Sequence, residues 1–315
     1  MSRRIFITGG TGFIGRAIID ALQGRGDKVV LLTRRARTDD EVLSQCDVVE
    51  GDPTSSGPWQ DRMAGCDAVI NLAGANVGDR RWTAKFKQQI HDSRIDTTRF
   101  VVEGMAALAD ADRPKALVSS SGIDYYPVDE DLGFDWDDDH VIGESTPPGD
   151  SYLARVCRHW ETEAREAAPL GVRVTLVRTG LVLGKGGALP RMARPFKWFV
   201  GGRLGKGRQW MSWVHLDDAV RGFLACLDDP QLKGPVNLVA PHPLRNAEFS
   251  RVLGRALRRP SAIPAPAFAI RAVAGEFSEY ILGGRRVMPL ALGATEFEFL
   301  YPELEAALAQ IYPPR

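Results

Sequence analysis

Thr8-Gly9-Gly10-Thr11-Gly12-Phe13-Ile14-Gly15 is the stretch of sequence that decides the fold. It follows a short apolar run, Arg4–Thr8, and opens an amphipathic stretch, Gly12–Leu22. A glycine triplet with this spacing, placed between a strand and a helix, is typical of the turn that binds the pyrophosphate of a dinucleotide. A purely structural glycine turn is the alternative, and the match in both spacing and context disfavours it.

Each position of the triplet requires glycine for a different physical reason. Gly9 permits the tight turn, Gly12 lets the backbone approach a pyrophosphate, and Gly15 lets the helix pack closely against the strand. The N-terminus of the helix adds positive potential for the phosphates. We therefore expect this loop to bind the cofactor through the following residues: Gly9, Thr11, Gly12, Phe13, Ile14 and Gly15.

The first half of the chain alternates short apolar runs with longer helical patterns. The runs are rich in Val, Ile and Leu, as in strands that are buried on both faces of a parallel sheet. They are Arg4–Thr8, Lys28–Thr33, Asp47–Asp52, Ala68–Ala73, Ala116–Ser121 and Arg173–Thr179. Helical patterns such as Thr83–Leu108 and Ser151–Ala168 lie between them. This alternation predicts an α/β fold, a Rossmann-type doubly wound parallel sheet.

The last third of the chain changes in character. Proline and glycine become dense at Gly184–Gly207 and Arg259–Pro266, and irregular segments join the helical patterns. This predicts a smaller C-terminal lobe that selects a substrate at the ends of the strands. We expect a Rossmann domain over residues 1–182, rejoined by residues 209–240, and a C-terminal substrate lobe over residues 183–315.

Composition argues against several classes of protein. Among 315 residues, 40 Lys plus Arg balance 40 Asp plus Glu. Net charge therefore gives no broad reason to expect nucleic acid or a membrane as a partner. No apolar run approaches the roughly 18 residues of a membrane span, and the first strand begins too early, at Arg4, to leave room for a signal peptide. We expect a cytoplasmic protein whose partner is a small molecule.

Cysteines and histidines give no support for a metal site. The four cysteines lie far apart, at Cys46, Cys66, Cys157 and Cys226, without the short CxxC spacing of a zinc site. The five histidines are also dispersed, with no HExxH arrangement. We expect no metal in the mechanism.

The end of the second predicted strand indicates which dinucleotide binds. An NAD site places an Asp or Glu there for the ribose hydroxyls. This chain has Thr33-Arg34-Arg35 instead, with no acidic residue before Asp39. Two guanidinium groups suit a 2′-phosphate through charge-assisted, often bidentate hydrogen bonds. We therefore expect NADP(H), with Thr33, Arg34 and Arg35 at its adenosine end. The alternative is that both arginines are solvated loop residues.

Further segments, in the right order along nearly the whole chain, connect the sequence with a known family. The chain resembles the extended short-chain dehydrogenase/reductases. Within them it is most similar to an atypical subfamily, NAD-dependent epimerase/dehydratase-like or cell-division-inhibitor-like, which carries its own small C-terminal domain. The matching segments are 8–15, 69–74 (VINLAG), 81–82 (RW), 92–95 (DSRI), 178–184 (RTGLVLG) and 207–218 (GRQWMSWVHLDD).

The resemblance implies further contacts with the cofactor. Asp52, after the third strand, matches a carboxylate that contacts the adenine amino group. The loop after the fourth strand matches the one that lies under the adenosine ribose and pyrophosphate, and the backbone after the sixth strand matches the segment that holds the nicotinamide amide. The residues in these two segments are Asn71, Ala73 and Gly74, and Thr179, Gly180 and Val182.

The catalytic residues follow the family pattern only in part. Active members use a Ser or Thr after the fifth strand, a Tyr as acid/base and a Lys four residues later, whose charge lowers the Tyr pKa. Ser121 and Tyr152 match the first two, and Asp150 is the expected N-cap of the Tyr152 helix. Val156 stands where the Lys belongs. Without that charge, the pKa of Tyr152 should stay near about 10.

Other groups could take these roles. Arg155 could supply positive charge from a neighbouring face of the same helix, and Tyr125 and Tyr126 are alternative hydroxyls. For Tyr152 itself, a structural aromatic at a helix start is the alternative. Met211 stands where nucleotide-sugar epimerases of the superfamily carry an arginine that grips the diphosphate, although Arg208 precedes it by three residues.

These features lead to one expected function and two alternatives. We expect an NADP(H)-binding oxidoreductase that acts on an unidentified small carbonyl or alcohol. The first alternative is a catalytically weak NADP(H)-binding protein that reports redox state to a partner. The second is a nucleotide-sugar epimerase, which fits the missing Lys less well. The oligomeric state stays open.

Overall fold

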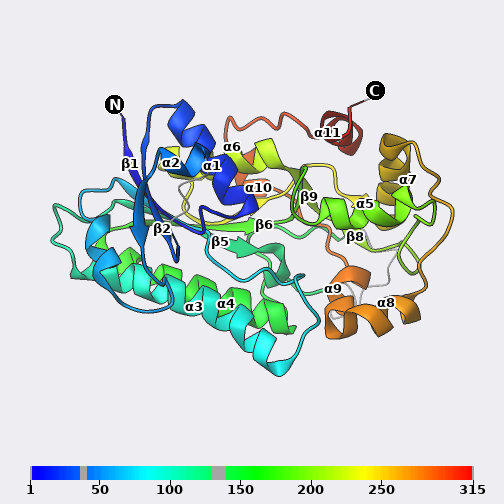
Figure 1. Ribbon diagram of the computed structural model, residues 1–315, viewed down its shortest axis with the longest axis horizontal. Helices are drawn as coiled ribbons and strands as arrows, with labels where there is room; N and C mark the ends of the chain where they lie inside the picture. The colour runs from blue at the N-terminus through cyan, green and yellow to red at the C-terminus, as the bar shows by residue number, and fades with distance from the viewer. Residues whose placement is uncertain (1, 36–40, 129–139, 314–315) are drawn as a thin grey trace.

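The computed structural model describes residues 2–35, 41–128 and 140–313 (Figure 1). Asp39, the first acidic residue after the second strand, lies outside these ranges. The centre of the molecule is a seven-stranded sheet in the order β10-β6-β5-β4-β1-β2-β3, and every pair of neighbours is parallel. The strands are β1 Arg4–Thr8, β2 Lys28–Thr33, β3 Asp47–Glu50, β4 Ala68–Asn71, β5 Ala116–Gly122, β6 Arg173–Thr179 and β10 Gly234–Leu238. This confirms the predicted doubly wound parallel sheet.

The strands are apolar at successive positions because helices cover both faces of the sheet. In β1, Ile5 and Ile7 face a core beneath α1 (Phe13–Gly24) and α6 (Leu216–Asp228). Phe6 faces the opposite core, beneath α3 (Ala84–Ala107) and α4 (Tyr152–Arg165). Figure 1 shows α3 and α4 side by side along one face, with α1 and α6 across the sheet from them.

The order of the strands positions a binding crevice. Strand β1 lies between β2 and β4, so the direction of winding reverses between β1 and β4. In open α/β sheets, ligands bind outside the carboxyl ends of the strands at such a reversal. The loops that leave the carboxyl ends of β1 and β4 begin at Thr8 and Asn71, which are register partners in the sheet.

The smaller lobe is built from short elements around its own core. Strand β7 (Leu181–Leu183) pairs in parallel with β9 (Trp213–His215), and β8 (Trp210–Met211) pairs antiparallel with β11 (Leu244–Arg245). Its apolar core includes the buried side chains of Trp213, Phe249 and Leu308. The helices here are α5 Leu189–Lys197, α7 Asn246–Leu257, α8 Ala267–Ala274, α9 Ser278–Leu282 and α11 Leu304–Ile311.

The chain leaves the sheet and later returns to it. After β6 it forms β7, α5, β8, β9 and α6, and then β10 pairs with β6 through Val236 opposite Val177. Segment Leu290–Gly293 (α10) contacts β10, so the C-terminal region also supports the edge of the sheet. Among the residues that the structure describes, none of the helices combines the length and apolar character needed to cross a bilayer.

Candidate functional site

The glycine loop after β1 is shaped by backbone contacts that exclude side chains. Gly9 has φ +70°, and a Cβ there would lie 2.7 Å from the backbone nitrogen of Ala73. A Cβ on Gly15 would lie 2.5 Å from the carbonyl oxygen of Gly9. Gly9 therefore allows the loops after β1 and β4 to meet, and Gly15 allows α1 to pack onto the loop.

Gly12 differs from the other two glycines because its surroundings are less crowded. The nearest atom to a Cβ on Gly12 would be the Gly9 carbonyl oxygen, at 3.2 Å, which is also the acceptor for the Gly12 amide. Gly12 is exposed and is the N-cap of α1, where no side chain caps the helix and no acidic residue lies in the first turn. This leaves space and positive potential for an anionic group. Thr11 lies in the same loop and is exposed.

Phe13 connects the glycine loop with the smaller lobe. A Cβ on Gly184, Gly186 or Gly187 would come within 2.6 to 3.0 Å of the Phe13 ring. The glycine-rich segment after β7 is therefore shaped to accept this ring. Ile14, the next residue, packs against the core under α1. Phe13 and Ile14 thus anchor the loop by packing.

The carboxyl end of β2 carries exposed positive charge. Arg34 and Arg35 are both exposed, and the Thr33 hydroxyl donates to the Arg35 carbonyl at 3.1 Å. Asp52 accepts hydrogen bonds from the Thr54 amide, at 3.0 Å, and from its hydroxyl, at 2.7 Å. These bonds, with a smaller contribution from the charge of Arg34, lower the pKa of Asp52. Asp52 is therefore an ionised acceptor close to Arg34.

Asn71 is fixed inside the protein. Its side chain is fully buried, accepts from the Thr8 hydroxyl at 2.6 Å and donates to the Thr98 hydroxyl at 2.8 Å. These bonds join the ends of β1 and β4 to α3, so the side chain positions the crevice. The following loop continues this network, because the Ala73 amide donates to the Thr8 hydroxyl at 3.3 Å.

The segment after β6 is held by its own backbone. A Cβ on Gly180 would lie 2.7 Å from the Ser212 carbonyl oxygen, so only glycine fits there. The Gly180 amide donates to Leu238 and the Leu181 amide donates to Ser212, at 3.1 and 2.9 Å. Thr179 and Val182, on either side, are partly exposed. This segment is therefore a rigid connection between β6, β10 and β9.

Ser121 belongs to a buried ionic network. Its hydroxyl donates to the carboxylate of Glu161 at 2.9 Å. Glu161 also accepts two hydrogen bonds from Arg178, at 2.7 and 2.9 Å, and its side chain is fully buried. Burial opposes the charge of Arg178, but the hydrogen bonds and charge of Glu161 outweigh it and raise the Arg178 pKa. The single hydroxyl hydrogen of Ser121 is therefore engaged, while its lone pairs stay available to accept.

The two tyrosines after β5 also contact Arg178. Tyr126 is fully buried, and its hydroxyl donates to Asn237 at 2.6 Å and accepts from Arg178 at 2.8 Å. Burial raises the pKa of Tyr126 to about 12. The centre of the Tyr125 ring lies 3.5 Å from the guanidinium carbon of Arg178, and the Tyr125 side chain is partly exposed.

Tyr152 opens α4, but its hydroxyl points toward α3. Ser151 is the N-cap of the helix, because its hydroxyl accepts from the Ala154 amide at 3.2 Å, so the prediction of Asp150 was wrong by one residue. The Tyr152 hydroxyl donates to the Lys87 carbonyl. Burial is the largest influence on this group and raises the pKa of Tyr152 to about 12, not the expected value near 10.

The turn of α4 that follows Tyr152 supplies no inward-facing charge. Val156 is buried against Ile95 and Trp160. Arg155 is exposed and donates to the Asp150 carbonyl at the start of the helix. The Lys position of the family pattern is therefore an apolar contact between α3 and α4, and Arg155 turns outward.

A cation does reach this region from α3. Arg94 donates to the carbonyls of Ala75 and Ile90, both at 3.0 Å. A Cβ on Gly74 would lie 3.1 Å from the guanidinium carbon of Arg94, so glycine leaves room for the side chain. The Arg94 charge lowers the pKa of Tyr152 and partly opposes the effect of burial. Arg94 is in the DSRI segment, but which way a helical arginine turns depends on packing that sequence does not reveal.

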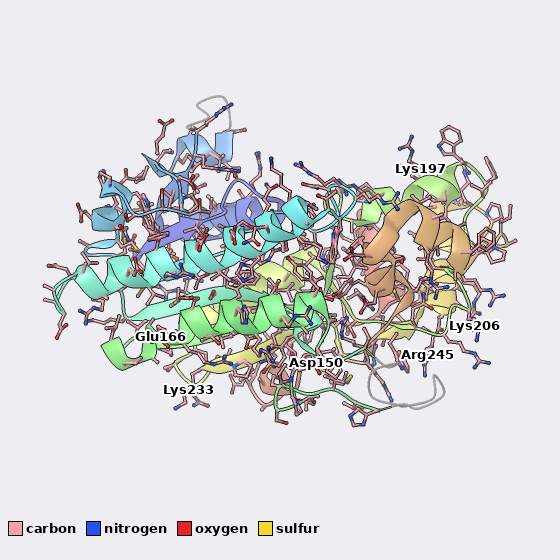
Figure 2. The ribbon with its side chains drawn as sticks, turned by 90° about the horizontal axis from the view of Figure 1, so that it is seen from below. Asp150, Glu166, Lys197, Lys206, Lys233 and Arg245 are labelled. Carbon is pink, nitrogen blue, oxygen red and sulfur yellow. The ribbon has the colours of Figure 1, made fainter. Side chains whose placement is uncertain are left out.

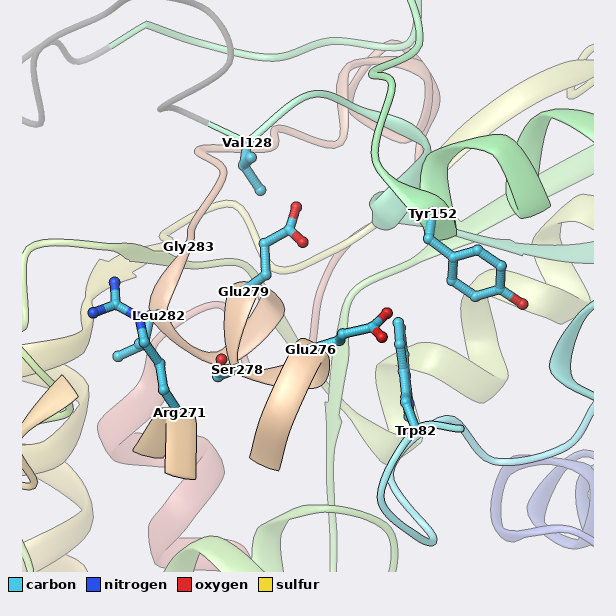
Figure 3. A pocket seen from close by; sticks show the side chains of 9 residues that line it. All are labelled: Trp82, Val128, Tyr152, Arg271, Glu276, Ser278, Glu279, Leu282 and Gly283. Carbon is cyan, nitrogen blue, oxygen red and sulfur yellow. The ribbon is translucent and has the colours of Figure 1, made fainter. Parts of the chain in front are cut away.

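A pocket of about 290 Å³ lies next to Tyr152 (Figure 3). Trp82, Val128 and the ring of Tyr152 border it on one side, while the other side is formed by α8, α9 and the turn between them. Figure 3 shows the Tyr152 hydroxyl directed away from the pocket. The residues from the second side are Arg271, Glu276, Ser278, Glu279, Leu282 and Gly283.

Aromatic side chains from both parts of the chain meet at this pocket. Trp82 lies 5.3 Å from Tyr152, 5.4 Å from Phe277 and 5.4 Å from Tyr280, measured between ring centres. Glu276 forms an ion pair with Lys87 at 2.6 Å. The pocket is therefore a junction between the sheet domain and the α8–α9 region, with mixed polar and aromatic walls. The sequence did not indicate it, because its walls come from distant segments.

Comparison with protein families agrees with a sheet domain followed by a C-terminal domain. Residues 5–239 match the model of the NAD dependent epimerase/dehydratase family, and residues 265–311 match a domain of unknown function, DUF1731. An Arabidopsis thaliana protein described as "Epimerase family protein SDR39U1 homolog, chloroplastic" is 38% identical over 308 residues, which cover 98% of this chain and 86% of that protein.

Two solved structures are similar over nearly the whole chain. Human epimerase family protein SDR39U1 (isoform 2), solved with NADPH, has a TM-score of 0.84 and 32% identity, covering 98% of this chain and 99% of that one. A nucleoside-diphosphate sugar epimerase from Corynebacterium glutamicum has a TM-score of 0.78 and 29% identity, covering 99% of this chain and 58% of that one.

Proposed function

The chain belongs to the NAD-dependent epimerase/dehydratase family, and on this premise we propose that it binds NADP(H) and reduces or oxidises a small carbonyl or alcohol substrate. The observation that carries the proposal is the open glycine loop. Gly12 is exposed at the uncapped start of α1, where a Cβ would meet only the Gly9 carbonyl within 4 Å. A dinucleotide pyrophosphate has the charge and size for this place.

The choice of NADP(H) over NAD(H) is supported by the end of β2. Arg34 and Arg35 are exposed there, and a 2′-phosphate would give both guanidinium groups an anionic partner. The human relative was solved with NADPH. Asp52, ionised and next to Arg34, would accept a hydrogen bond from the adenine amino group.

The pocket between the sheet domain and α8–α9 is the proposed place for the substrate. When bound, the nicotinamide supplies or accepts the hydride. Ser121 is buried and is not among the residues that line this pocket, so a substrate must extend beyond the pocket to reach it. The Ser121 hydroxyl would then accept a hydrogen bond from a substrate hydroxyl, because its own hydrogen is given to Glu161. Tyr152 holds a proton at its hydroxyl, and delivering it into the pocket requires the hydroxyl to leave the Lys87 carbonyl.

A second candidate function is a cofactor-binding protein with little turnover. It is favoured by the same two hydroxyls, because Ser121 is engaged by Glu161 and Tyr152 is engaged by Lys87 with a pKa of about 12. A general acid with so high a pKa is poorly matched to neutral pH. Such a protein would bind NADPH tightly and report its presence to a partner.

One experiment separates the two functions. NADPH binding is measured by calorimetry, and NADPH oxidation is followed across a panel of small carbonyl compounds, for wild type, Ser121→Ala, Tyr152→Phe and Gly12→Ala. Turnover that falls in Ser121→Ala and Tyr152→Phe, while both variants still bind NADPH, supports the oxidoreductase. Binding without turnover in wild type supports the second function. Absence of NADPH binding to wild type contradicts both.

A further inference from the structure

An exposed apolar turn follows α5 at the far end of the smaller lobe. Trp198, Phe199 and Val200 are consecutive, and their side chains are 71%, 57% and 52% exposed. Ile263, which is 51% exposed, lies beside them, because its amide donates to the Gly201 carbonyl at 3.2 Å. Single exposed apolar residues are ordinary, whereas a contiguous group of this size marks an interaction surface.

The backbone of this surface is held in an unfavourable conformation. Phe199 has φ +62° and Arg258, at the end of α7, has φ +53°, and these are the two non-glycine residues with left-handed φ in the described ranges. Glycine would adopt both conformations without a steric penalty. Both residues end a helix, because the amides of Val200 and Arg259 donate to the carbonyls of Pro195 and Gly254, at 3.0 and 2.9 Å. A left-handed residue is usual at such a helix end, so these conformations terminate α5 and α7 and present the exposed side chains that follow.

Positive charge surrounds the apolar turn. Arg251, Arg255, Arg258 and Arg259 line a shallow depression of about 520 Å³ at the end of α7. The guanidinium carbon of Arg259 lies 4.7 Å from the centre of the Phe199 ring, which joins the basic and apolar parts. Among these four arginines, and within the described ranges, only Arg255 forms an ion pair with a carboxylate. Its partner is Glu305, at 3.1 Å.

Two lysines lie at the same end of the molecule as these arginines. Figure 2 shows Lys197 and Lys206 at the end formed by the smaller lobe, and Lys233 and Glu166 toward the opposite end. The zero net charge of the whole chain therefore does not exclude positive charge at this tip. The expectation of no membrane partner rested on that net charge and on the lack of a long apolar run in the sequence, and neither of these describes a surface patch.

We propose that this basic–apolar tip, made of Lys197–Val200, Ile263 and the arginines at positions 251, 255, 258 and 259, docks on an anionic lipid surface. Tryptophan and phenylalanine prefer the boundary between headgroups and acyl chains, and neighbouring arginines and lysines attract anionic headgroups. The tip thus has the chemistry for shallow insertion by its apolar turn and for electrostatic attraction by its rim.

Two other occupants fit the tip less well. A second copy of the chain, placed by a twofold axis, would bring arginine against arginine, and like charges oppose that contact. Nucleic acid would neutralise the arginines and could stack on Trp198, but the aliphatic side chains of Val200 and Ile263 have no role in stacking. Aliphatic and aromatic side chains together favour the lipid surface.

The test uses the full chain and sedimentation with vesicles of phosphatidylcholine, alone or with about 30 mol% phosphatidylglycerol. Wild type should bind the anionic vesicles and not the neutral ones, and added salt should weaken binding. Two double variants, Trp198→Ser/Phe199→Gly and Arg251→Glu/Arg259→Glu, should each lower the partition coefficient by about tenfold or more. Phe199→Gly also relieves backbone strain, so lost binding there would not reflect unfolding.

Control variants remove similar groups elsewhere. Lys233→Glu changes charge at the opposite end, and Leu290→Ser removes an apolar side chain that is 54% exposed on α10. Both should bind anionic vesicles as wild type does. Equal binding of wild type to neutral and anionic vesicles, or unchanged binding in both tip variants, overturns the proposal. So does absence of vesicle binding, whether the tip is then found to bind a single-stranded oligonucleotide or a second copy of the chain.

Discussion

The guanidinium carbon of Arg94 lies 5.2 Å from the centre of the Trp160 ring, which brings a cation from α3 against α4. Trp160 is one helical turn beyond Val156, the position at which related enzymes carry the lysine. The charge that α4 lacks is therefore provided, in part, by the neighbouring helix. Burial of Tyr152 opposes the effect of the Arg94 charge. The charge therefore limits the rise in the Tyr152 pKa but does not reverse it.

Replacement of Arg94 by methionine should raise the pKa of Tyr152 further. Methionine keeps an apolar stem and removes the charge that favours tyrosinate. The ultraviolet difference between each protein and its Tyr152→Phe derivative isolates this one tyrosine during an alkaline titration. Arg155→Met is the matched control and should give a smaller shift, because Arg155 is exposed and its charge is screened. Equal shifts in the two variants would show that Arg94 has no special effect.

Alkaline pH should destabilise the fold between pH 10 and 12, a range in which lysines also lose their protons. Burial raises the pKa of Tyr152 and Tyr280 to about 12 from an ordinary value of 10. The unfolded chain then releases these protons between pH 10 and 12 while the folded protein retains them, so stability is full below pH 10 and falls through this window. Urea denaturation at a series of pH values measures the slope. Tyr280→Phe should make it shallower, and an unchanged slope would contradict the assignment.

Gly15→Ala and Gly12→Ala should separate folding from binding. A Cβ on Gly15 collides with the backbone of Gly9, so that variant should lose about 1–3 kcal/mol of stability. A Cβ on Gly12 would meet one atom, the Gly9 carbonyl oxygen at 3.2 Å, which a small backbone shift relieves. Gly12→Ala should therefore unfold at nearly the wild-type temperature and yet fail to bind NADPH, where the backbone meets the pyrophosphate. Normal NADPH affinity in Gly12→Ala would rule out the assigned role of the loop.

Arg34→Ala and Arg35→Ala should weaken NADPH without affecting NADH. Each lost charge-assisted hydrogen bond costs about 1.5–3 kcal/mol, which is roughly tenfold or more in affinity. NADH lacks the 2′-phosphate, so its affinity serves as the internal control in calorimetry. A parallel loss for both nucleotides would indicate that the arginines shape the loop and do not contact the phosphate.

Glu161→Gln should be among the most destabilising conservative changes in α4. It leaves the buried guanidinium of Arg178 without its counter-ion, and breaking a buried pair in this way costs about 3–5 kcal/mol. Glu166→Gln, at the exposed end of the same helix, is the matched control and should change stability little. Urea denaturation compares the two, and similar midpoints would mean that the ion pair contributes little.

The fold was predictable because its signals are local. Each strand, such as Lys28–Thr33, and the glycine loop can be recognised from a few consecutive residues. The directions of the side chains at the site could not be predicted, because contacts between distant elements set them. Ser121 turns to Glu161, and the Tyr152 hydroxyl turns to Lys87. Arg94 turns to the loop after β4. The pocket beside Tyr152 also needed the structure, as α8 and α9 lie far along the chain from Trp82.

The pairing of β6 with β10 has a consequence for how the protein is made. Strand β6 ends at Thr179, and its outer partner ends at Leu238. During synthesis the outer backbone of β6 stays unpaired until the whole intervening segment has emerged, and an open strand edge is prone to pair with other chains. Joining strands so distant in sequence is also slow. A chain that stops after β6 should therefore aggregate, because the sheet is complete only when the chain through Leu238 has been synthesised.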